Sequence, residues 1–126
     1  MNVAPRPWPG LATLLTEHGA SVRTADSAAG AVAWLDQETP SLILADIGMP
    51  GQDGLSMMRA IRRRPPHRGG TVPSIALSAY ARAEDKRAAI AAGFDAYLTK
   101  PALPSDVLHA VDRLLATARG RVAGVR

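Results

Sequence analysis

Residues 41–54 read Ser-Leu-Ile-Leu-Ala-Asp-Ile-Gly-Met-Pro-Gly-Gln-Asp-Gly, and this stretch decides the fold class. It opens with a continuously apolar run, Leu42-Ile43-Leu44, which is typical of a strand that helices cover on both faces. We therefore predict a strand over Ser41–Ala45, and Asp46 follows it directly. Asp53 precedes Gly54 and the next apolar stripe, so we assign it mainly to capping a helix.

Three further segments read as strands, and helical segments separate all of them. The predicted strands are Ala20–Ala25, Val72–Leu77 and Ala96–Thr99, in addition to Ser41–Ala45. Five helices are predicted from apolar stripes. The first has a stripe of Leu11, Leu14 and Leu15 and ends at Gly19, and the second follows a Ser27 cap and buries Ala31, Val32 and Leu35. The third carries Leu55, Met58 and Ile61 and stops before Pro65-Pro66, the fourth spans Ala83–Ala92, and the last is lined by Val107, Val111, Leu114, Leu115 and Ala118. This alternation favours a parallel α/β domain.

Composition agrees with one compact domain. The chain has 126 residues, 47% of them hydrophobic and 21% charged, and it contains no cysteine. The absence of cysteine excludes a disulfide framework and a thiolate metal site. No apolar run approaches the roughly 20 residues that span a bilayer, so we expect a cytoplasmic protein without a membrane partner. The net charge of +4 leaves nucleic acid as a weak alternative partner, and we expect no direct DNA binding.

Polar residues stand where three predicted strands end. Asp46 follows Ala45, Ser78 follows Leu77, and Lys100 follows Thr99. Ligands of open parallel sheets bind outside the carboxyl ends of the strands, so these three side chains are expected to converge. A carboxylate nucleophile, a hydroxyl donor and an ammonium group suit phosphoryl transfer to Asp46.

Three segments in order resemble the receiver domain of bacterial two-component response regulators. They are Leu42 to Leu55, Val72 to Ala81 and Ala92 to Pro101, and the resemblance extends over about Leu11 to Leu115. It implies a flavodoxin-like doubly wound parallel sheet. It also implies that Asp46 is the phosphoacceptor, that Ser78 is the hydroxyl that senses the phosphoryl group and that Lys100 is its charge partner. Tyr97 is implied as the aromatic switch, and the Gly48 backbone carbonyl as a Mg²⁺ ligand beside Asp46. The resemblance further implies a cis peptide bond between Lys100 and Pro101.

The sequence departs from this family at its start. Family members begin with a central strand that ends in two adjacent acidic residues, and the family's spacing back from Gly19 places that pair at Asn2 and Val3. The first strand and the acidic pair are therefore missing, and Mg²⁺ binding is expected to be weakened because Asp46 is the only carboxylate left. We expect a Pro-rich segment over residues 1–10, a receiver-like domain over 11–118 and a basic, frayed tail over 119–126. A start codon placed downstream of the true one, a truncated gene and a closed-up sheet each remain open.

Several features have ordinary structural explanations. Alone, Asp46 would be a turn former, Ser78 a loop hydroxyl and Tyr97 a packed aromatic residue. The histidines His18, His67 and His109 show no ligand spacing. The run Arg62-Arg63-Arg64 is interpreted as a solvated helix end, because cations complement the negative end of the helix dipole.

Three functions remain open at this stage. The first is a single-domain, non-enzymatic receiver that takes a phosphoryl group from a histidine kinase or a histidine phosphotransfer protein. The second is a degenerate pseudo-receiver that binds proteins without phosphorylation. An aspartyl-phosphate phosphatase ranks last, since Gly48 stands where that class has a second aspartate.

Overall fold

The structure, a computed structural model, describes residues 17, 28–47, 53–100 and 102–125, without the side chains of residues 28, 46, 53 and 117–125. The elements in chain order are α2 (Ala28–Gln37), β1 (Ile43–Ile47), α3 (Asp53–Arg62), a 3₁₀ turn η1 (Pro66–Arg68), β2 (Ser74–Ser78), α4 (Ala83–Ala92), β3 (Ala96–Thr99) and α5 (Pro104–Val125). The strands pair in parallel in the order β1-β2-β3, which confirms the predicted parallel α/β architecture. The predicted strand Ala20–Ala25 and the helix ending at Gly19 lie outside the described residues.

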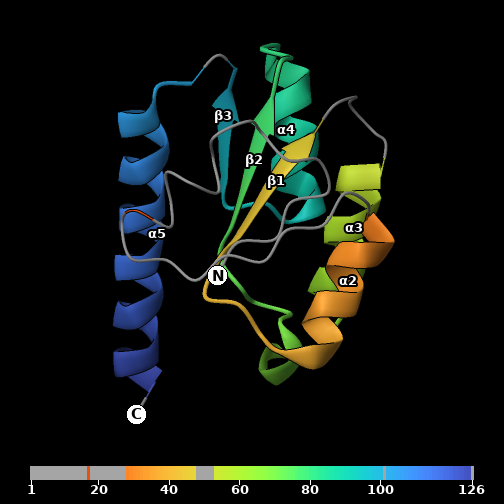
Figure 1. Ribbon diagram of the computed structural model, residues 1–126, viewed down its shortest axis with the longest axis vertical. Helices are drawn as coiled ribbons and strands as arrows, with labels where there is room; N and C mark the ends of the chain where they lie inside the picture. Colours follow the sequence, from red (N-terminus) through yellow and green to blue (C-terminus); the bar gives the residue numbers. More distant parts are fainter. Residues whose placement is uncertain (1–16, 18–27, 48–52, 101, 126) are drawn as a thin grey trace.

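The sheet is the middle one of three layers. Figure 1 shows α5 on one side of the strands and α2 and α3 on the other. Alternate residues of β1 serve the two layers: Ile43, Ala45 and Ile47 pack with α2, α3 and α4, whereas Leu42, just before the strand, and Leu44 pack with α5. Burial on both faces explains why this strand is continuously apolar in sequence.

The boundaries of two strands, β1 and β2, differ from the prediction. β1 begins and ends two residues later than expected, so Asp46 lies inside the strand and does not follow it. β2 spans Ser74–Ser78 where Val72–Leu77 was predicted, so Ser78 is its last residue and does not follow it. Pro73 has no N–H to donate to a ladder, and its carbonyl instead accepts the Ile43 amide at 2.8 Å. α3 begins at Asp53, so Asp53 is the first residue of the helix and not the cap residue that precedes it, as was predicted.

The helices follow the predicted stripes, with one difference in extent. Ala31 and Leu35 of α2 are buried as predicted. α5 continues to Val125 and so takes in most of the segment expected to be a frayed tail. A single glycine costs a helix only about 1 kcal/mol, whereas each added residue gains a backbone hydrogen bond. No helix in the described part of the chain has both the length and the apolarity needed to cross a membrane.

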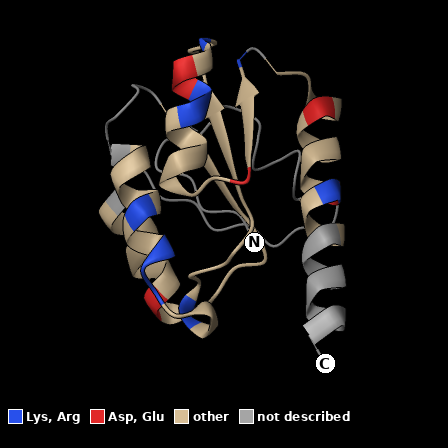
Figure 2. Ribbon diagram, turned by 180° about the vertical axis from the view of Figure 1, so that it is seen from behind, with Lys and Arg blue, Asp and Glu red and all other residues tan. Residues whose placement is uncertain are grey.

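Basic residues gather at the carboxyl end of α3 and in the connection that follows it (Figure 2). The Arg64 guanidinium donates to Asp36 of α2 at 2.7 Å, and Arg68 contacts the same oxygen at 3.5 Å. The hydrogen bond from Arg64 is the main cause that holds the pKa of Asp36 below its ordinary value. We predicted that this end of α3 is a solvated helix end. The structure differs, because the hydrogen bond from Arg64 to Asp36 connects the segment after α3 to α2.

Gly93 ends α4 in a conformation that side chains rarely adopt. Its φ is +124°, and its amide donates to the carbonyls of Ala89 and Ile90. A Cβ at this position would lie 2.5 Å from Cγ of Arg62. The glycine is thus required both by the backbone and by the arginine stem packed against it.

Gly93→Ala is expected to lower the free energy of unfolding by about 1–3 kcal/mol, the range for a residue held in a sparsely populated backbone region. Chemical denaturation of the full chain measures the loss. Ala91→Gly, at an exposed position of the same helix, is the control and should cost no more than about 1 kcal/mol. A Gly93→Ala protein as stable as the unaltered chain would contradict this account.

Candidate functional site

The parallel register places the predicted site residues on neighbouring strands. Asp46 pairs with Leu77, and Ser78 pairs with Ile47 on one side and Thr99 on the other. The Lys100 amide then donates to the Ser78 carbonyl at 2.7 Å, which continues the ladder one residue past β3. The backbone positions of Asp46, Ser78 and Lys100 are therefore adjacent at the carboxyl edge of the sheet.

Ser78 is the best-defined polar group at this edge. It is the last residue of β2 and only 1% of its surface is exposed. Its Oγ accepts a hydrogen bond from the Tyr80 amide at 3.0 Å. A hydroxyl that accepts in this way still has its own proton to donate, so Ser78 is oriented by the loop after β2 and retains a donor.

Tyr97 is connected to Ser78 through the same loop. Its phenol, on half-buried β3, donates to the carbonyl of Tyr80 at 2.6 Å. Tyr80 thus uses its amide toward Ser78 and its carbonyl toward Tyr97. Sequence reasoning missed Tyr80, because these contacts are made by backbone groups and no side-chain pattern marks them.

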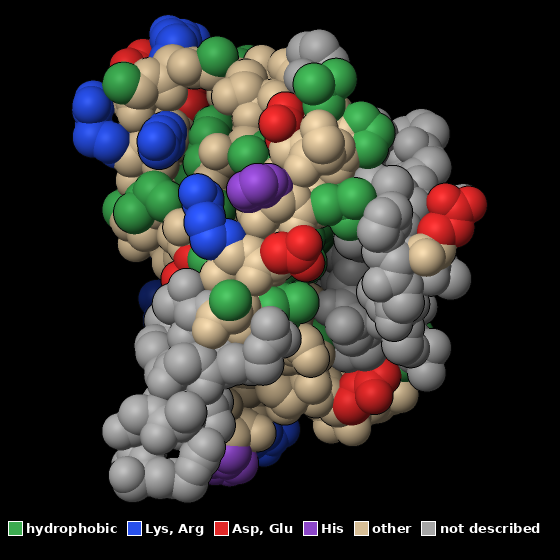
Figure 3. Space-filling view, turned by 90° about the vertical axis from the view of Figure 1, so that its left-hand side faces the viewer, with side chains coloured by type: hydrophobic (Ala, Val, Ile, Leu, Met, Phe, Trp, Pro, Cys, Tyr) green, Lys and Arg blue, Asp and Glu red, His purple; other side chains and the backbone are tan. Residues whose placement is uncertain are grey.

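A surface groove of about 480 Å³ lies beside Tyr97, between β3 and α5. Figure 3 looks onto the α5 side of the molecule, where charged and hydrophobic side chains are interspersed. The groove is lined by Tyr97, Leu98, Thr99, Ala102, Asp106, His109, Ala110 and Arg113. A change in the position of the Tyr97 ring would therefore alter the shape of this groove.

The predicted magnesium ligands fall outside the part of the chain that the structure describes. Asp46 and Gly48 are the two predicted ligands, and the Asp46 side chain and the whole of Gly48 lie outside the described part, as does Pro101 with its predicted cis bond. No acidic residue precedes Glu17 in the sequence. In the described ranges, no three His, Cys, Asp or Glu side chains are grouped so as to hold a metal ion. One carboxylate and one carbonyl are few ligands for a hard divalent cation.

The fold and the polar edge define a class, the doubly wound parallel α/β domain with its site at the carboxyl ends of the strands. The sequence matches the response regulator receiver domain family over residues 8–112, and the chain belongs to this family. It is therefore a receiver domain of the kind found in two-component systems.

Two relatives illustrate the range of proteins that carry such a domain. An uncharacterised 14.6 kDa protein of Leptolyngbya boryana is 41% identical over 100 residues, which are 79% of this chain and 75% of that protein. The sensor histidine kinase GacS of Pseudomonas protegens is 42% identical over 90 residues, 71% of this chain. This stretch is only 10% of the kinase, so the chain corresponds to a small part of that protein.

Solved structures agree with the family assignment. The CheY-like receiver domain protein from Methanospirillum hungatei has a TM-score of 0.80 with 24% identity over 95% of both chains, which supports the fold. The receiver domain of the sensor histidine kinase PA1611 from Pseudomonas aeruginosa has a TM-score of 0.77 with 27% identity, covering 91% of this chain and 97% of that one. That structure contains a magnesium ion in its active site cleft.

Tyr97→Phe is expected to loosen the loop between β2 and α4, because it removes the donor to the Tyr80 carbonyl. The free energy of unfolding should fall by about 0.5–1.5 kcal/mol, and amide hydrogen exchange should rise in residues 79–82. Tyr80→Phe is the matched control, since the contact uses the backbone of Tyr80 and not its phenol. Unchanged exchange in this loop for Tyr97→Phe would show that the bond does not hold it.

Proposed function

We propose that this receiver domain accepts a phosphoryl group on Asp46 from a phosphohistidine of a histidine kinase or a histidine phosphotransfer protein. The observation that supports it best is the register, which makes Asp46, Ser78 and Lys100 neighbours at one sheet edge. A carboxylate oxygen of Asp46 forms a bond to phosphorus, and the bond from phosphorus to the donor's imidazole nitrogen breaks. The imidazole leaves with the electron pair and takes up a proton.

Ser78 and Lys100 have separate tasks in this reaction. The Ser78 hydroxyl, already oriented by the Tyr80 amide, donates a hydrogen bond to one phosphoryl oxygen. The Lys100 ammonium offsets negative charge on another oxygen as the phosphoryl group transfers. Neither residue forms a covalent bond, so both act by electrostatic stabilisation and not as nucleophiles.

Tyr97 is the proposed switch because it shares Tyr80 with Ser78. When Ser78 turns its hydroxyl toward a phosphoryl oxygen, the geometry of the bond from the Tyr80 amide changes. That change is passed to the Tyr80 carbonyl and to the Tyr97 phenol, and then to the groove beside β3. The domain would thus signal to an output protein through this surface.

A phosphorylation-independent binding module is the second candidate. It is favoured by the donor set, since no acidic residue precedes Glu17 and the sequence offers Asp46 as the only carboxylate among the expected Mg²⁺ ligands. Labelling with acetyl phosphate in the presence and absence of Mg²⁺ separates the two functions. Label that depends on Mg²⁺ supports the receiver, and absence of label under both conditions supports the binding module.

Asp46→Asn is expected to abolish labelling, because the amide keeps the shape of the side chain and removes the nucleophile. Intact-protein mass spectrometry after incubation with acetyl phosphate measures the label. Asp53→Asn, which changes the next carboxylate along the chain, is the control and should label normally. Label that persists in Asp46→Asn would refute the assignment.

Lys100→Ala is expected to impair labelling far more than it lowers stability. The ammonium lies at a strand end outside both apolar clusters, so its loss should change the free energy of unfolding by no more than about 1 kcal/mol. The rate of labelling should fall by about tenfold or more. Lys86→Ala, an exposed lysine on α4, controls for the loss of charge. Strong destabilisation with unchanged labelling would make Lys100 a structural residue.

A further inference from the structure

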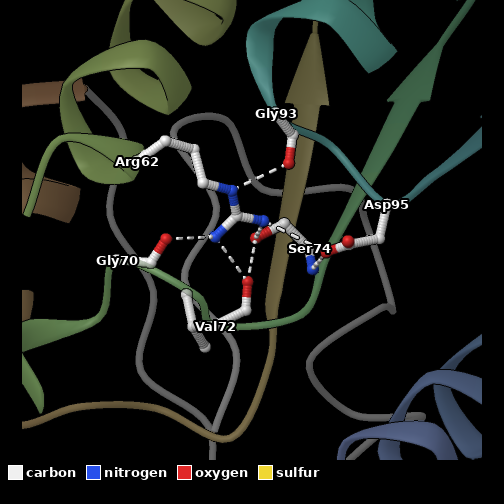
Figure 4. A network of polar contacts seen from close by, with 6 residues as sticks. All are labelled: Arg62, Gly70, Val72, Ser74, Gly93 and Asp95. Atoms are coloured by element: carbon white, nitrogen blue, oxygen red, sulfur yellow. Dashed lines mark hydrogen bonds and ion pairs between the residues drawn. The ribbon is translucent and has the colours of Figure 1, made fainter. Parts of the chain in front are cut away.

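Arg62, the last residue of α3, joins three separate parts of the chain at the edge of the sheet opposite the proposed site (Figure 4). Its side chain is only 21% exposed, and its guanidinium donates to five acceptors. The acceptors are the carbonyls of Gly70, Val72 and Gly93, the hydroxyl of Ser74 and the carboxylate of Asp95. A planar fork of donors suits this task, which a lysine cannot perform.

Two of these acceptors also bind each other. The Ser74 amide donates to Oδ2 of Asp95 at 2.8 Å, and the Asp95 amide donates to the Ser74 carbonyl at 2.8 Å. Ser74 is the first residue of β2, and Asp95 is the residue just before β3. The reciprocal pair therefore fixes which residue of β3 faces which residue of β2.

The rest of the β2–β3 ladder follows from this pair. From Ile75 opposite Ala96, the register runs to Ser78 opposite Thr99. β3 has four residues, and β2 is its only neighbour in the described sheet. A slip of one residue would move Lys100 by about 3.3 Å along the strand and turn Tyr97 to the other face.

We propose that Arg62 and Asp95 are positioning residues, which set the geometry of Ser78, Tyr97 and Lys100 by fixing the register of β3 from the far end of the sheet. The proposal rests on the function proposed above. Arg62 holds the Asp95 carboxylate, the carboxylate holds the Ser74 amide, and the ladder carries that alignment to the Lys100 amide on the Ser78 carbonyl. The two residues touch no reacting group.

The test compares Asp95→Ala with Asp95→Asn in the full chain. Alanine removes the acceptor for the Ser74 amide, whereas asparagine keeps a side-chain oxygen that accepts the same hydrogen bond. Ile61→Ala is the matched control. It opens a cavity under α3, the helix that carries Arg62, without removing any hydrogen bond of the Arg62 guanidinium or of Asp95. All proteins are assayed at a temperature where each is fully folded, so that stability alone does not change the rate.

The rate of labelling by acetyl phosphate should fall about tenfold or more in Asp95→Ala and stay within about twofold of the unaltered chain in Asp95→Asn and Ile61→Ala. The amide resonances of Ser78, Tyr97 and Lys100 should shift in Asp95→Ala and return in Asp95→Asn. If Asp95→Ala does not fold, Arg62→Lys serves in its place, because lysine keeps the charge but lacks the fork. Equal rates and equal resonances in Asp95→Ala and Ile61→Ala would overturn the proposal.

The two proposals fail differently. If the unaltered chain takes no label, phosphoryl acceptance fails, and the resonances of Ser78, Tyr97 and Lys100 still decide whether Asp95 sets their geometry. If the unaltered chain labels and Asp95→Ala labels equally fast with unshifted resonances, acceptance stands and the positioning role fails.

Discussion

The parallel pairing of β2 with both of its neighbours is the constraint on which the rest of the domain depends. Ser78, at the end of β2, is in register with Ile47 on one side and with Thr99 on the other. Parallel ladders are slightly less stable for each residue than antiparallel ones, and they persist where helices cover both faces. The two apolar clusters, one under α2, α3 and α4 and one under α5, supply that cover.

The two ends of this sheet carry different kinds of polar structure. At the start of β2 and β3, Arg62 and Asp95 satisfy one another and the backbone around them, so the groups there stabilise and do not react. At the carboxyl end, the Ser78 Oγ accepts a hydrogen bond from the Tyr80 amide and keeps its own O–H to donate. The separation allows the alignment of the site to be set by groups that take no part in its chemistry.

Two loop positions, Gly93 and Tyr80, act through their backbone. Gly93 is needed because its backbone has a positive φ and because the Arg62 stem occupies the space of a side chain. Tyr80, by contrast, acts through its amide and carbonyl, so its side chain is not what connects Ser78 to Tyr97. At both positions the contacts are made by backbone groups and not by a side chain.

Local patterns in the sequence were sufficient to predict the fold class and to place three polar residues at neighbouring strand ends. The apolar run Leu42-Ile43-Leu44 predicted a buried parallel strand, and polar residues at successive strand ends predicted that Asp46, Ser78 and Lys100 share an edge. Both inferences use contacts between neighbours in sequence or a rule that holds for every parallel sheet. Strand boundaries were less accurate, because the end of a strand depends on its partner: β1 extends through Asp46 to Ile47 as far as β2 extends to Ser78.

Only the tertiary structure decided the role of Arg62. Its sequence context, three arginines at the end of a helix, indicates a cation near a helix terminus, and that is what we predicted. Its acceptors at Gly93 and Asp95 lie 31 and 33 residues away along the chain. No local periodicity encodes such a contact, because it exists only when α3, β2 and the connection before β3 have packed together. Sequence by itself therefore determined which polar residues stand at the strand ends, and long-range packing decided what holds them in register.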